Sequence, residues 1–210
     1  MLVTLMISLT MSFISCNSCN KENNTGIDST STNEILEGLA IKVEHTVALD
    51  RQSIYNILGG KDFMWYGTWI DLKYFMDSEE ASAEIAGVTN LFQWVEEIDE
   101  KSFDVKVIES TWEENGKHVI TTVPGFWVGV SDLSKDSIKV TFDDAFVKIM
   151  EAKIKKPHSK KCALIKDKNS ENENPQYIFG DDDQIYVDAI TGQITQVNQN
   201  QIGKPLGEWP

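Results

Sequence analysis

The first fifteen residues, MLVTLMISLTMSFIS, carry no charge and limit where the folded body of this 210-residue chain begins. A membrane-spanning helix needs about 20 apolar residues, so an uncharged run of this length is typical of a signal-peptide core. The next segment, NSCNKENNTGIDSTSTN over 17–33, contains almost no apolar side chain. It cannot bury enough surface to offset the entropy lost on ordering. We therefore expect a signal peptide over 1–15, a flexible tether over 16–33 and a folded body from Glu34.

Cys16 directly follows a small residue, Ser15. The segment Phe13-Ile14-Ser15-Cys16 resembles the lipobox cut by the lipoprotein signal peptidase, with Phe13 standing where leucine is usual. In that family the cysteine becomes the new N-terminus and carries the acyl chains. The resemblance implies a lipid on Cys16 that anchors the protein to a bacterial membrane, in the first place the outer membrane, with its body extracytoplasmic in the cell envelope. An ordinary cleaved signal and a buried N-terminal strand are the open alternatives.

Two cysteines remain if Cys16 is acylated, and an exported protein is able to pair Cys19 with Cys162. Cys19 lies in the expected tether and Cys162 in an expected strand, so we expect a free, partly buried thiol at Cys162. Cys16 and Cys19 have the CxxC spacing, but no second Cys or His pair accompanies them, as a structural zinc site requires.

The charge of the chain argues against several classes of partner. Nineteen basic and thirty-three acidic residues give a formal net charge of −14. Such an excess repels phosphate backbones and anionic lipid headgroups, so we expect no nucleic-acid binding. The acidic residues are spread along the chain without a long block of one sign, as is typical of a soluble surface. A hydrophobic content of 41% is enough to fill a core.

The N-terminal region of the body, 34–135, contains short apolar segments that differ in their period. Alternation of polar and apolar residues predicts a half-buried strand, whereas apolar residues at intervals of three and four predict one face of a helix. On this basis we expect strands over 41–49, 63–70, 103–107, 118–123 and 126–130, and helices over 50–58 and 78–97. The stretch from Leu36 to Val43 is also compatible with the start of a helix.

Caps and turns delimit these elements. Asp50 and Asp77 offer the side-chain oxygens that a helix N-cap requires, and Gly59-Gly60 is expected to end the first helix. Asn115-Gly116 is the strongest turn signal in the chain and predicts a hairpin between the strands on either side.

The C-terminal region, 136–210, predicts one helix followed by strands. Thr141 is placed to cap the helix with Asp144 as its reciprocal partner, and Pro157 marks the end of the helix. The expected buried stripe of this helix is Ala145, Phe146, Ile149 and Met150. We expect strands over 162–165, 177–179, 185–189 and 194–197. The predicted fold class is α+β, with antiparallel sheets each covered by a helix, and the recurring order would make two helix-plus-strands units in tandem.

The segment 141–197 resembles a PepSY domain, a small α+β module of exported proteins. Two stretches carry the resemblance: TFDDAFVKIM over 141–150 and IYVDAITGQI over 185–194. In the PepSY family the second stretch commonly reads as an aromatic or aliphatic pair, Asp, a small residue, any residue, Thr, Gly, an acid and an aliphatic residue, and Gln193 replaces the acid here. PepSY domains are associated with regulating peptidases, often as a propeptide or inhibitor partner, and with envelope sensing. The resemblance implies a non-enzymatic module that acts by protein or peptide contact.

The same hairpin also has a structural explanation. Gly192 can adopt the positive φ that closes a tight turn, and Asp188 or Thr191 can accept hydrogen bonds from backbone N–H groups within it. We therefore interpret Asp188, Thr191 and Gly192 as a turn motif that requires no ligand.

No set of residues at a recognisable spacing predicts catalysis. Asp181-Asp182-Asp183 lacks the alternating oxygen ligands and central glycine of a calcium loop, so we interpret it as a solvated loop. His45, His118 and His158 are isolated and lack the HExxH spacing of zinc hydrolases, so we interpret each as a surface or strand residue. The chain also lacks a G-x-S-x-G elbow, a Walker loop and a dinucleotide fingerprint. We therefore expect no enzyme activity, no metal and no cofactor.

Six aromatic residues are the remaining sign of recognition: Trp65, Tyr66, Trp69, Trp94, Trp112 and Trp127. Aromatic side chains form interface hot spots and stack on sugars or peptides, but they fill cores more often. Two functional hypotheses follow. The first is a binding or regulatory lipoprotein that holds a peptide or another envelope protein. The alternative is an accessory hydrolase or carbohydrate-binding lipoprotein with an acidic, Trp-lined cleft.

Overall fold

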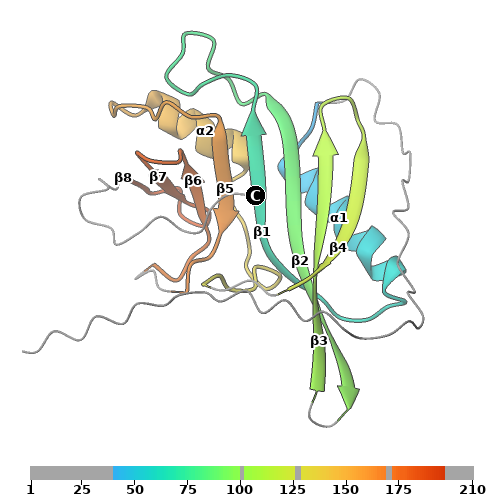
Figure 1. Cartoon of the computed structure of the whole chain (residues 1–210). Coiled ribbons are helices and arrows are strands. Elements are labelled where there is room, and N and C mark those ends of the chain that lie inside the picture. Colours follow the sequence, from blue (N-terminus) through green and yellow to red (C-terminus); the bar gives the residue numbers. More distant parts are fainter. Residues whose placement is uncertain (1–39, 100–101, 126–128, 169–171, 197–210) are drawn as a thin grey trace, which may run out of the picture.

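The computed structural model describes residues 40–99, 102–125, 129–168 and 172–196. The predicted lipid site Cys16, the expected tether and Trp127 lie outside these ranges. The described chain forms two helices and eight strands (Figure 1). In chain order they are α1 (Val43–Ile57), β1 (Met64–Leu72), β2 (Ile85–Asp99), β3 (Ser102–Glu113), β4 (His118–Pro124), α2 (Phe142–Glu151), β5 (Lys161–Ile165), β6 (Gln176–Phe179), β7 (Ile185–Asp188) and β8 (Ile194–Gln196).

All eight strands form one antiparallel sheet in the order β4-β3-β2-β1-β5-β6-β7-β8. Neighbours in the chain are neighbours in the sheet within β1–β4 and within β5–β8, so the sheet consists of two meanders, each preceded by one helix. The meanders meet where Gly67 to Asp71 of β1 pair with Lys161 to Ile165 of β5. The N-terminal and C-terminal regions therefore share one continuous sheet, and the prediction of an antiparallel α+β fold is confirmed at this coarse level.

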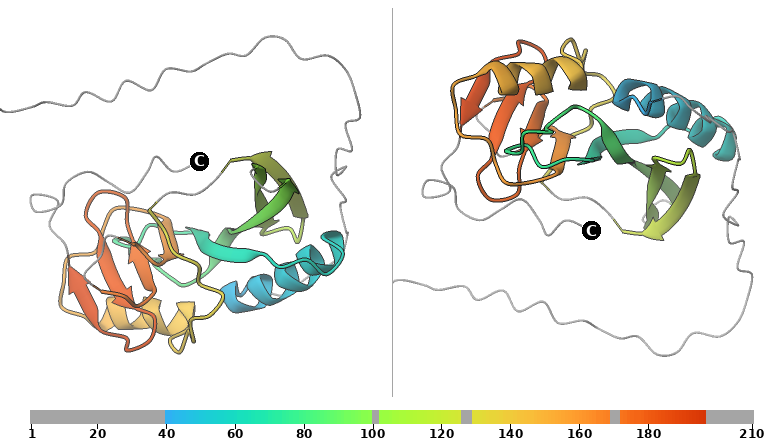
Figure 2. Two further views of the ribbon diagram at one scale, coloured as in Figure 1. Left: turned by 90° about the horizontal axis from the view of Figure 1, so that it is seen from below. Right: turned by 90° about the horizontal axis from the view of Figure 1, so that it is seen from above.

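Both helices cover the same face of the sheet (Figure 2). α1 contacts β2, and α2 contacts β7. One apolar cluster joins the buried sides of both helices to the facing side chains of the sheet, and it includes Ile54 of α1, Phe92 of β2 and Phe146 of α2. We call the opposite face of the sheet, which neither helix covers, the open face.

α1 and α2 are joined where each of them begins. Glu44 lies in the first turn of α1, and its carboxylate accepts a hydrogen bond of 2.8 Å from the backbone N–H group of Phe142, the first residue of α2. Lys42, just before α1, pairs with Asp143 in the first turn of α2. Because the first N–H groups of a helix have no acceptor inside it, α1 in this way supplies part of the cap of α2.

The prediction for α2 is confirmed in its cap and for most of its buried side. The Thr141 hydroxyl accepts a hydrogen bond of 3.1 Å from the N–H group of Asp144 and donates one of 2.8 Å to the Asp144 carboxylate. Met150 is half-buried, and α2 ends at Glu151, before Pro157. The buried residues of α2 are Phe142, Ala145, Phe146 and Ile149.

The strand predicted over 41–49 is wrong, because these residues belong largely to α1. Val43 and Val47 fit both an alternating pattern and a helical pattern, since a spacing of four residues satisfies both periods. The continuation decides for a helix: Asp50 and Ile54 are buried at intervals of three and four. Asp50 is therefore an interior residue of α1, not the N-cap of a later helix.

The helix predicted over 78–97 is also wrong, since Ile85–Asp99 is strand β2 and Asp77 caps no helix. Alternate residues of β2 face the helices, among them Val88 and Phe92. Leu91, on the opposite face of the same strand, is buried too. When a strand is buried on both faces, its apolar residues lose the simple alternation, and here they fall by chance at helical intervals.

The other predicted strands correspond to β1, β3, β4 and β5–β8. The Asn115-Gly116 turn is confirmed, because Gly116 has a φ of +81° and the Asn115 side chain accepts a hydrogen bond of 2.8 Å from the N–H group of Lys117. Of the strand expected over 126–130, residues 126–128 lie outside the described residues, and Val130 forms a single bridge with Asp167.

Candidate functional site

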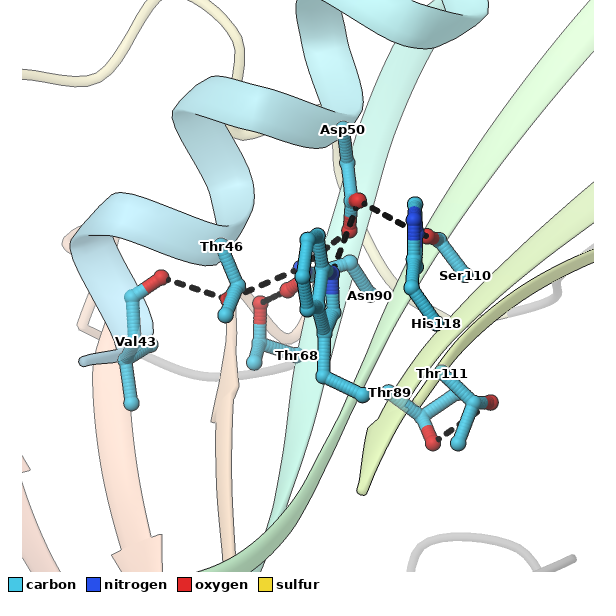
Figure 3. A network of polar contacts seen from close by, with 10 residues as sticks. Val43, Thr46, Asp50, Thr68, Thr89, Asn90, Ser110, Thr111 and His118 are labelled. Carbon is cyan, nitrogen blue, oxygen red and sulfur yellow. Dashed lines mark hydrogen bonds and ion pairs between the residues drawn. The ribbon is translucent and has the colours of Figure 1, made fainter. Parts of the chain in front are cut away.

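A buried polar network joins α1 to the sheet, with Asp50 at its centre (Figure 3). Asp50 is 0% exposed. One of its carboxylate oxygens accepts a hydrogen bond of 2.9 Å from Trp112 Nε1 and lies 3.0 Å from His118 Nε2. The other oxygen accepts a hydrogen bond of 2.6 Å from Asn90 Nδ2. Strands β2, β3 and β4 therefore each contribute one contact to a carboxylate that α1 supplies.

The rest of the network provides partners for the amide of Asn90. Thr68 Oγ1 donates a hydrogen bond of 2.6 Å to Asn90 Oδ1, and Asn90 Nδ2 also donates one of 3.1 Å to Thr46 Oγ1. Thr46 in turn donates to the carbonyl of Val43 at 2.8 Å. A buried polar group without a partner costs about 1–3 kcal/mol, so this chain of satisfied groups favours one position of α1 on the sheet.

Ser110, His118 and Asp50 have the composition of a serine-hydrolase triad, but their geometry excludes that chemistry. In a triad, the serine hydroxyl and the carboxylate bind opposite nitrogens of the histidine ring. Here Ser110 Oγ lies 2.7 Å and Asp50 Oδ1 3.0 Å from the same nitrogen, Nε2. All three residues are buried, and the ring of Trp112 stacks on His118 with 3.8 Å between centroids. We therefore interpret this group as structural, in agreement with the prediction that His118 is a strand residue.

The predicted turn residues Asp188, Thr191 and Gly192 lie together between β7 and β8. Gly192 has a φ of +73°, and its N–H group donates a hydrogen bond of 2.8 Å to the Asp188 carbonyl. One carboxylate oxygen of Asp188 accepts from the N–H groups of Ile190 and Thr191, both at 2.8 Å. The Thr191 hydroxyl accepts from the N–H group of Gln193 at 3.2 Å.

Asn172 and Asn174, which no sequence pattern indicated, bind the second carboxylate oxygen of Asp188. Their Nδ2 atoms donate to it at 3.0 Å and 2.8 Å. Burial raises the pKa of Asp188, but these bonds and the backbone N–H bonds outweigh burial and hold the pKa well below its usual range. Both oxygens of this carboxylate are engaged by donors of the chain itself, so the motif has a complete structural role.

The predicted solvated loop, Asp181–Asp183, is exposed. Ser159 Oγ donates a hydrogen bond of 2.7 Å to the Asp181 carboxylate, and Lys155 Nζ lies 3.4 Å from that of Asp183. Within the described ranges, no group of three His, Cys, Asp or Glu residues is placed to hold a metal ion.

The remaining histidines and the described cysteine have simple surroundings. His45 is exposed on α1, and His158 is exposed and pairs with Asp77 at 3.0 Å. Cys162 is a free thiol that is fully rather than partly buried, and this burial raises its pKa well above the usual range. Because the thiolate is the reactive form, Cys162 is inert where it lies. Cys19 lies outside the described residues.

Most of the aromatic residues fill the core. Trp65, Trp94 and Trp112 are buried on the helix-covered face, as predicted. Tyr66 and the half-buried Trp69 lie on the open face, next to a smaller apolar cluster. These five side chains point to opposite faces of the sheet and line no common cleft.

A cavity of about 450 Å³ lies beside the start of α1 and the loop between β1 and β2. Its charged side chains pair with one another: Lys73 Nζ lies 3.1 Å from Glu84 and 2.9 Å from Glu114, and Lys42 pairs with Asp143. Hydrogen bonds to Glu114 and Glu84 raise the pKa of Lys73. The cavity is lined by no tryptophan and each of its three carboxylates pairs with a lysine, so it does not resemble an acidic, Trp-lined cleft.

The open face over β2, β3 and β4 carries apolar side chains that reach solvent. Val88 and Phe92 of β2 face the helices, so the residues that alternate with them face away. Leu91 and Val107 are buried, whereas Val95 and Val123 are 41% and 39% exposed. From the strand registers, the open-face side chains are Thr89, Leu91, Gln93 and Val95 on β2, Val105, Val107, Glu109 and Thr111 on β3, and Val119, Thr121 and Val123 on β4.

The open face over β1, β5 and β6 is closed in part by the segment that follows β4. Val130 of this segment belongs to the apolar cluster of Tyr66 and Ile165. The N–H group of Ser131 donates to the carbonyl of Lys166 at 2.8 Å, which fixes the segment beside β5. The two halves of the open face therefore differ, and the half over β2–β4 is the candidate binding surface.

Comparison with protein-family models, with curated proteins and with solved structures finds no match for this chain. In the part of the chain that the structure describes, no helix combines the length and the apolar character needed to cross a membrane. The function is therefore inferred from the candidate surface and from the sequence.

Proposed function

We propose that this protein is a lipid-anchored envelope protein that acts without catalysis, by holding a protein or peptide segment on the open face over β2–β4. The observation that carries this proposal is the exposure of Val95 and Val123 on a sheet face that no described helix covers. Val95 pairs with Val105, and Val123 pairs with Val107, the next open-face residue of β3. These four valines therefore form one patch. A contiguous exposed apolar patch favours contact with a partner.

The PepSY resemblance of 141–197 supports the same function. This segment supplies α2 and β5–β8, and the preceding α1 and β1–β4 have the same order of elements. We propose that the chain consists of two PepSY-like units in tandem whose sheets join at β1 and β5. A module of this kind would regulate its partner by contact, and a peptidase is the first partner class to test.

The lipid anchor is a separate part of the proposal and has its own test. An apolar run that ends in Ser15-Cys16, followed by a polar tether, supports acylation of Cys16. Metabolic labelling with a fatty-acid probe is expected to label the wild-type protein and not Cys16→Ala. Equal labelling of the two proteins would refute the anchor.

Two exposed valines provide a matched test of the binding surface. Val95 lies on the open face and is 41% exposed, and Val147 lies on the outer side of α2 and is 49% exposed. In capture experiments from envelope extract, wild type and Val147→Asp are expected to retain a common partner that Val95→Asp loses. Retention of that partner by Val95→Asp would exclude the open face as the binding surface.

The absence of catalysis is tested directly on the purified protein. We expect no turnover of peptide, ester or glycan substrates. Turnover that disappears when one acidic residue or histidine is replaced, in a variant that remains folded, would instead support the accessory-hydrolase alternative.

A further inference from the structure

β4 forms one edge of the sheet among the described residues, and before its final Pro124 it lacks the charges and bulges that usually protect an edge strand. Its sequence, HVITTVP, contains five β-branched residues and no acidic residue, Lys or Arg. The strand pairs with β3 over seven residues without a bulge. Edge strands in natural proteins are commonly short, charged or bulged, because an uncharged regular edge pairs readily with another strand. The opposite edge follows that rule in the described part of the chain, where β8 spans three residues.

The hydrogen bonds at the two ends of β4 show which of its backbone groups point outward. The N–H group of Glu113 donates to the carbonyl of Lys117, and the N–H group of Gly125 donates to the carbonyl of Val105. In an antiparallel pair, bonded and non-bonded residue pairs alternate. The odd-numbered residues of β4 therefore bond to β3, and the N–H and C=O groups of His118, Ile120 and Thr122 point away from the sheet. Pro124, which has no N–H group, stands next in this outward series and ends the free edge.

Glu109 introduces one charge into the open face next to this edge. It lies between Leu91 of β2 and Thr121 of β4, and it is half-buried. Among the described residues, no Lys, Arg or His forms an ion pair with Glu109. Thr121, the residue between Glu109 and the free edge, has a small side chain.

The distances allow a cation on an added strand to reach this carboxylate. Strands lie about 4.8 Å apart, so a strand added beside β4 lies about 10 Å from β3. A Lys or Arg side chain that crosses Thr121 spans this separation together with the side chain of Glu109. Val119 and Val123 are the open-face residues of β4 on either side of Thr121. On the added strand, the residues two positions before and after the cation lie opposite these valines, so apolar side chains there would contact them.

We propose that the edge of β4 binds an extended peptide segment as an antiparallel ninth strand, and that the segment carries Lys or Arg opposite Thr121 with apolar residues two positions to either side. This inference rests on the proposed function and specifies the partner of the same surface. Backbone bonds to Ile120 and Thr122 provide affinity, and the pairing of the cation with Glu109 provides selectivity. Such a segment also complements the net charge of −14.

Synthetic capped peptides test the proposal on the full chain carrying Cys16→Ala to prevent acylation. Val-Thr-Lys-Thr-Val at millimolar concentration is expected to slow amide hydrogen exchange of Ile120 and Thr122. Val-Pro-Lys-Pro-Val, which lacks the N–H groups facing these residues, is expected not to bind. Absence of any slowed exchange with the first peptide, or equal binding of the two, would overturn the proposal.

Variants of the protein separate the two parts of the recognition. Glu109→Gln is expected to weaken the lysine peptide about fivefold, as for loss of one partly exposed ion pair. Glu109→Lys is expected to prefer Val-Thr-Glu-Thr-Val. Glu173→Gln, at an exposed position outside the sheet, is the control and should bind as wild type does. Equal affinity of the lysine and glutamate peptides for wild type would overturn the assignment of Glu109.

Thr122→Pro distinguishes this inference from the proposed function. It removes an outward N–H group at an edge position where proline is tolerated. If the captured envelope partner is lost by Val95→Asp but retained by both Thr122→Pro and Glu109→Gln, the open face is the binding surface and the added strand is wrong. If Val95→Asp also retains it, the proposed function itself fails.

Discussion

The two halves of the sheet have the same order of elements, but different chemistry holds each helix in place. α2 packs through aromatic residues: Phe142 and Phe146 contact Phe179 with centroid distances of 5.9 Å and 6.3 Å. α1 instead presents Thr46 and Asp50 to the sheet, and their partners on β2, β3 and β4 form the buried network, which Thr68 of β1 joins through Asn90. α2 is held by shape and apolar area, whereas α1 adds directed hydrogen bonds to the apolar contacts of Val43, Val47 and Ile54.

This difference determines how each half responds to substitution. Apolar contacts are non-directional, so a core tolerates side chains of similar volume. A buried carboxylate is stable only while its donors remain in place, and removal of the carboxylate leaves those donors unsatisfied. We therefore expect the α1 half to be more sensitive to a single substitution than the α2 half.

The largest expected effect is that of Asp50→Ala. The substitution leaves Trp112 Nε1 without an acceptor and Asn90 Nδ2 with Thr46 Oγ1 as its remaining acceptor, in a fully buried site. We expect the free energy of unfolding to fall by about 3–5 kcal/mol, because each buried donor that loses its acceptor costs about 1–3 kcal/mol. Urea denaturation measures it. A loss below about 1 kcal/mol would mean that water or a rearranged side chain replaces the carboxylate, and that α1 does not depend on the network.

Asp188→Asn tests the polar site of the other half. We expect the free energy of unfolding to fall by about 2 kcal/mol at neutral pH, because an amide cannot accept hydrogen bonds from all four N–H donors that bind the carboxylate. The pKa of Asp188 is lowered in the folded protein, so its contribution is present above the unfolded pKa of about 3.9 and is lost as pH falls through the folded value. The difference in stability between wild type and variant should therefore shrink below about pH 4. If the difference in stability between wild type and variant stays constant from neutral pH to about pH 2, Asp188 does not have a lowered pKa in the folded protein.

Phe146→Leu is expected to cost only about 1–1.5 kcal/mol, although Phe146 is buried on α2. Leucine keeps an apolar side chain in the aromatic cluster, and neighbouring rings are able to adjust. Thermal unfolding of this variant beside Asp50→Asn, which also keeps the approximate volume, gives the comparison directly. If Phe146→Leu proves the more damaging of the two, the proposed contrast between the halves is wrong.

The same contrast explains which parts of the fold the sequence predicted. α2 was predicted because its buried stripe is apolar and Thr141 gives a clear cap. The helix predicted over 50–58 matches the second half of α1, but the first half was misread as a strand. Thr46 and Asp50 occupy the buried face of α1, and a polar residue at a core position weakens the periodic signal. β2 was misread because both of its faces bury apolar residues.

The sites follow the same division. The turn at Asp188, Thr191 and Gly192 is local, so its residues were named from the sequence. The partners Asn172 and Asn174 are distant in the chain, and only the fold brings them to Asp188. Glu109, which forms no ion pair with a described Lys, Arg or His, lies beside the edge of β4 because of the strand order, and no local pattern of a single sequence encodes that order.

The smallest expected effect compares two glycines, one in each half. Gly192 has a φ of +73°, where an alanine is strained by about 1 kcal/mol, and the nearest atom to a new Cβ is the flexible Cε of Lys148 at 2.8 Å. Gly87 in β2 has no positive φ, and its nearest neighbour would be the Trp112 carbonyl at 3.4 Å. Gly192→Ala should therefore lower the melting temperature, whereas Gly87→Ala should leave it unchanged or raise it, because alanine restricts the unfolded chain. If both variants change the melting temperature equally, the turn at Gly192 tolerates a side chain. The positive φ of Gly192 would then give no difference in stability between the two halves.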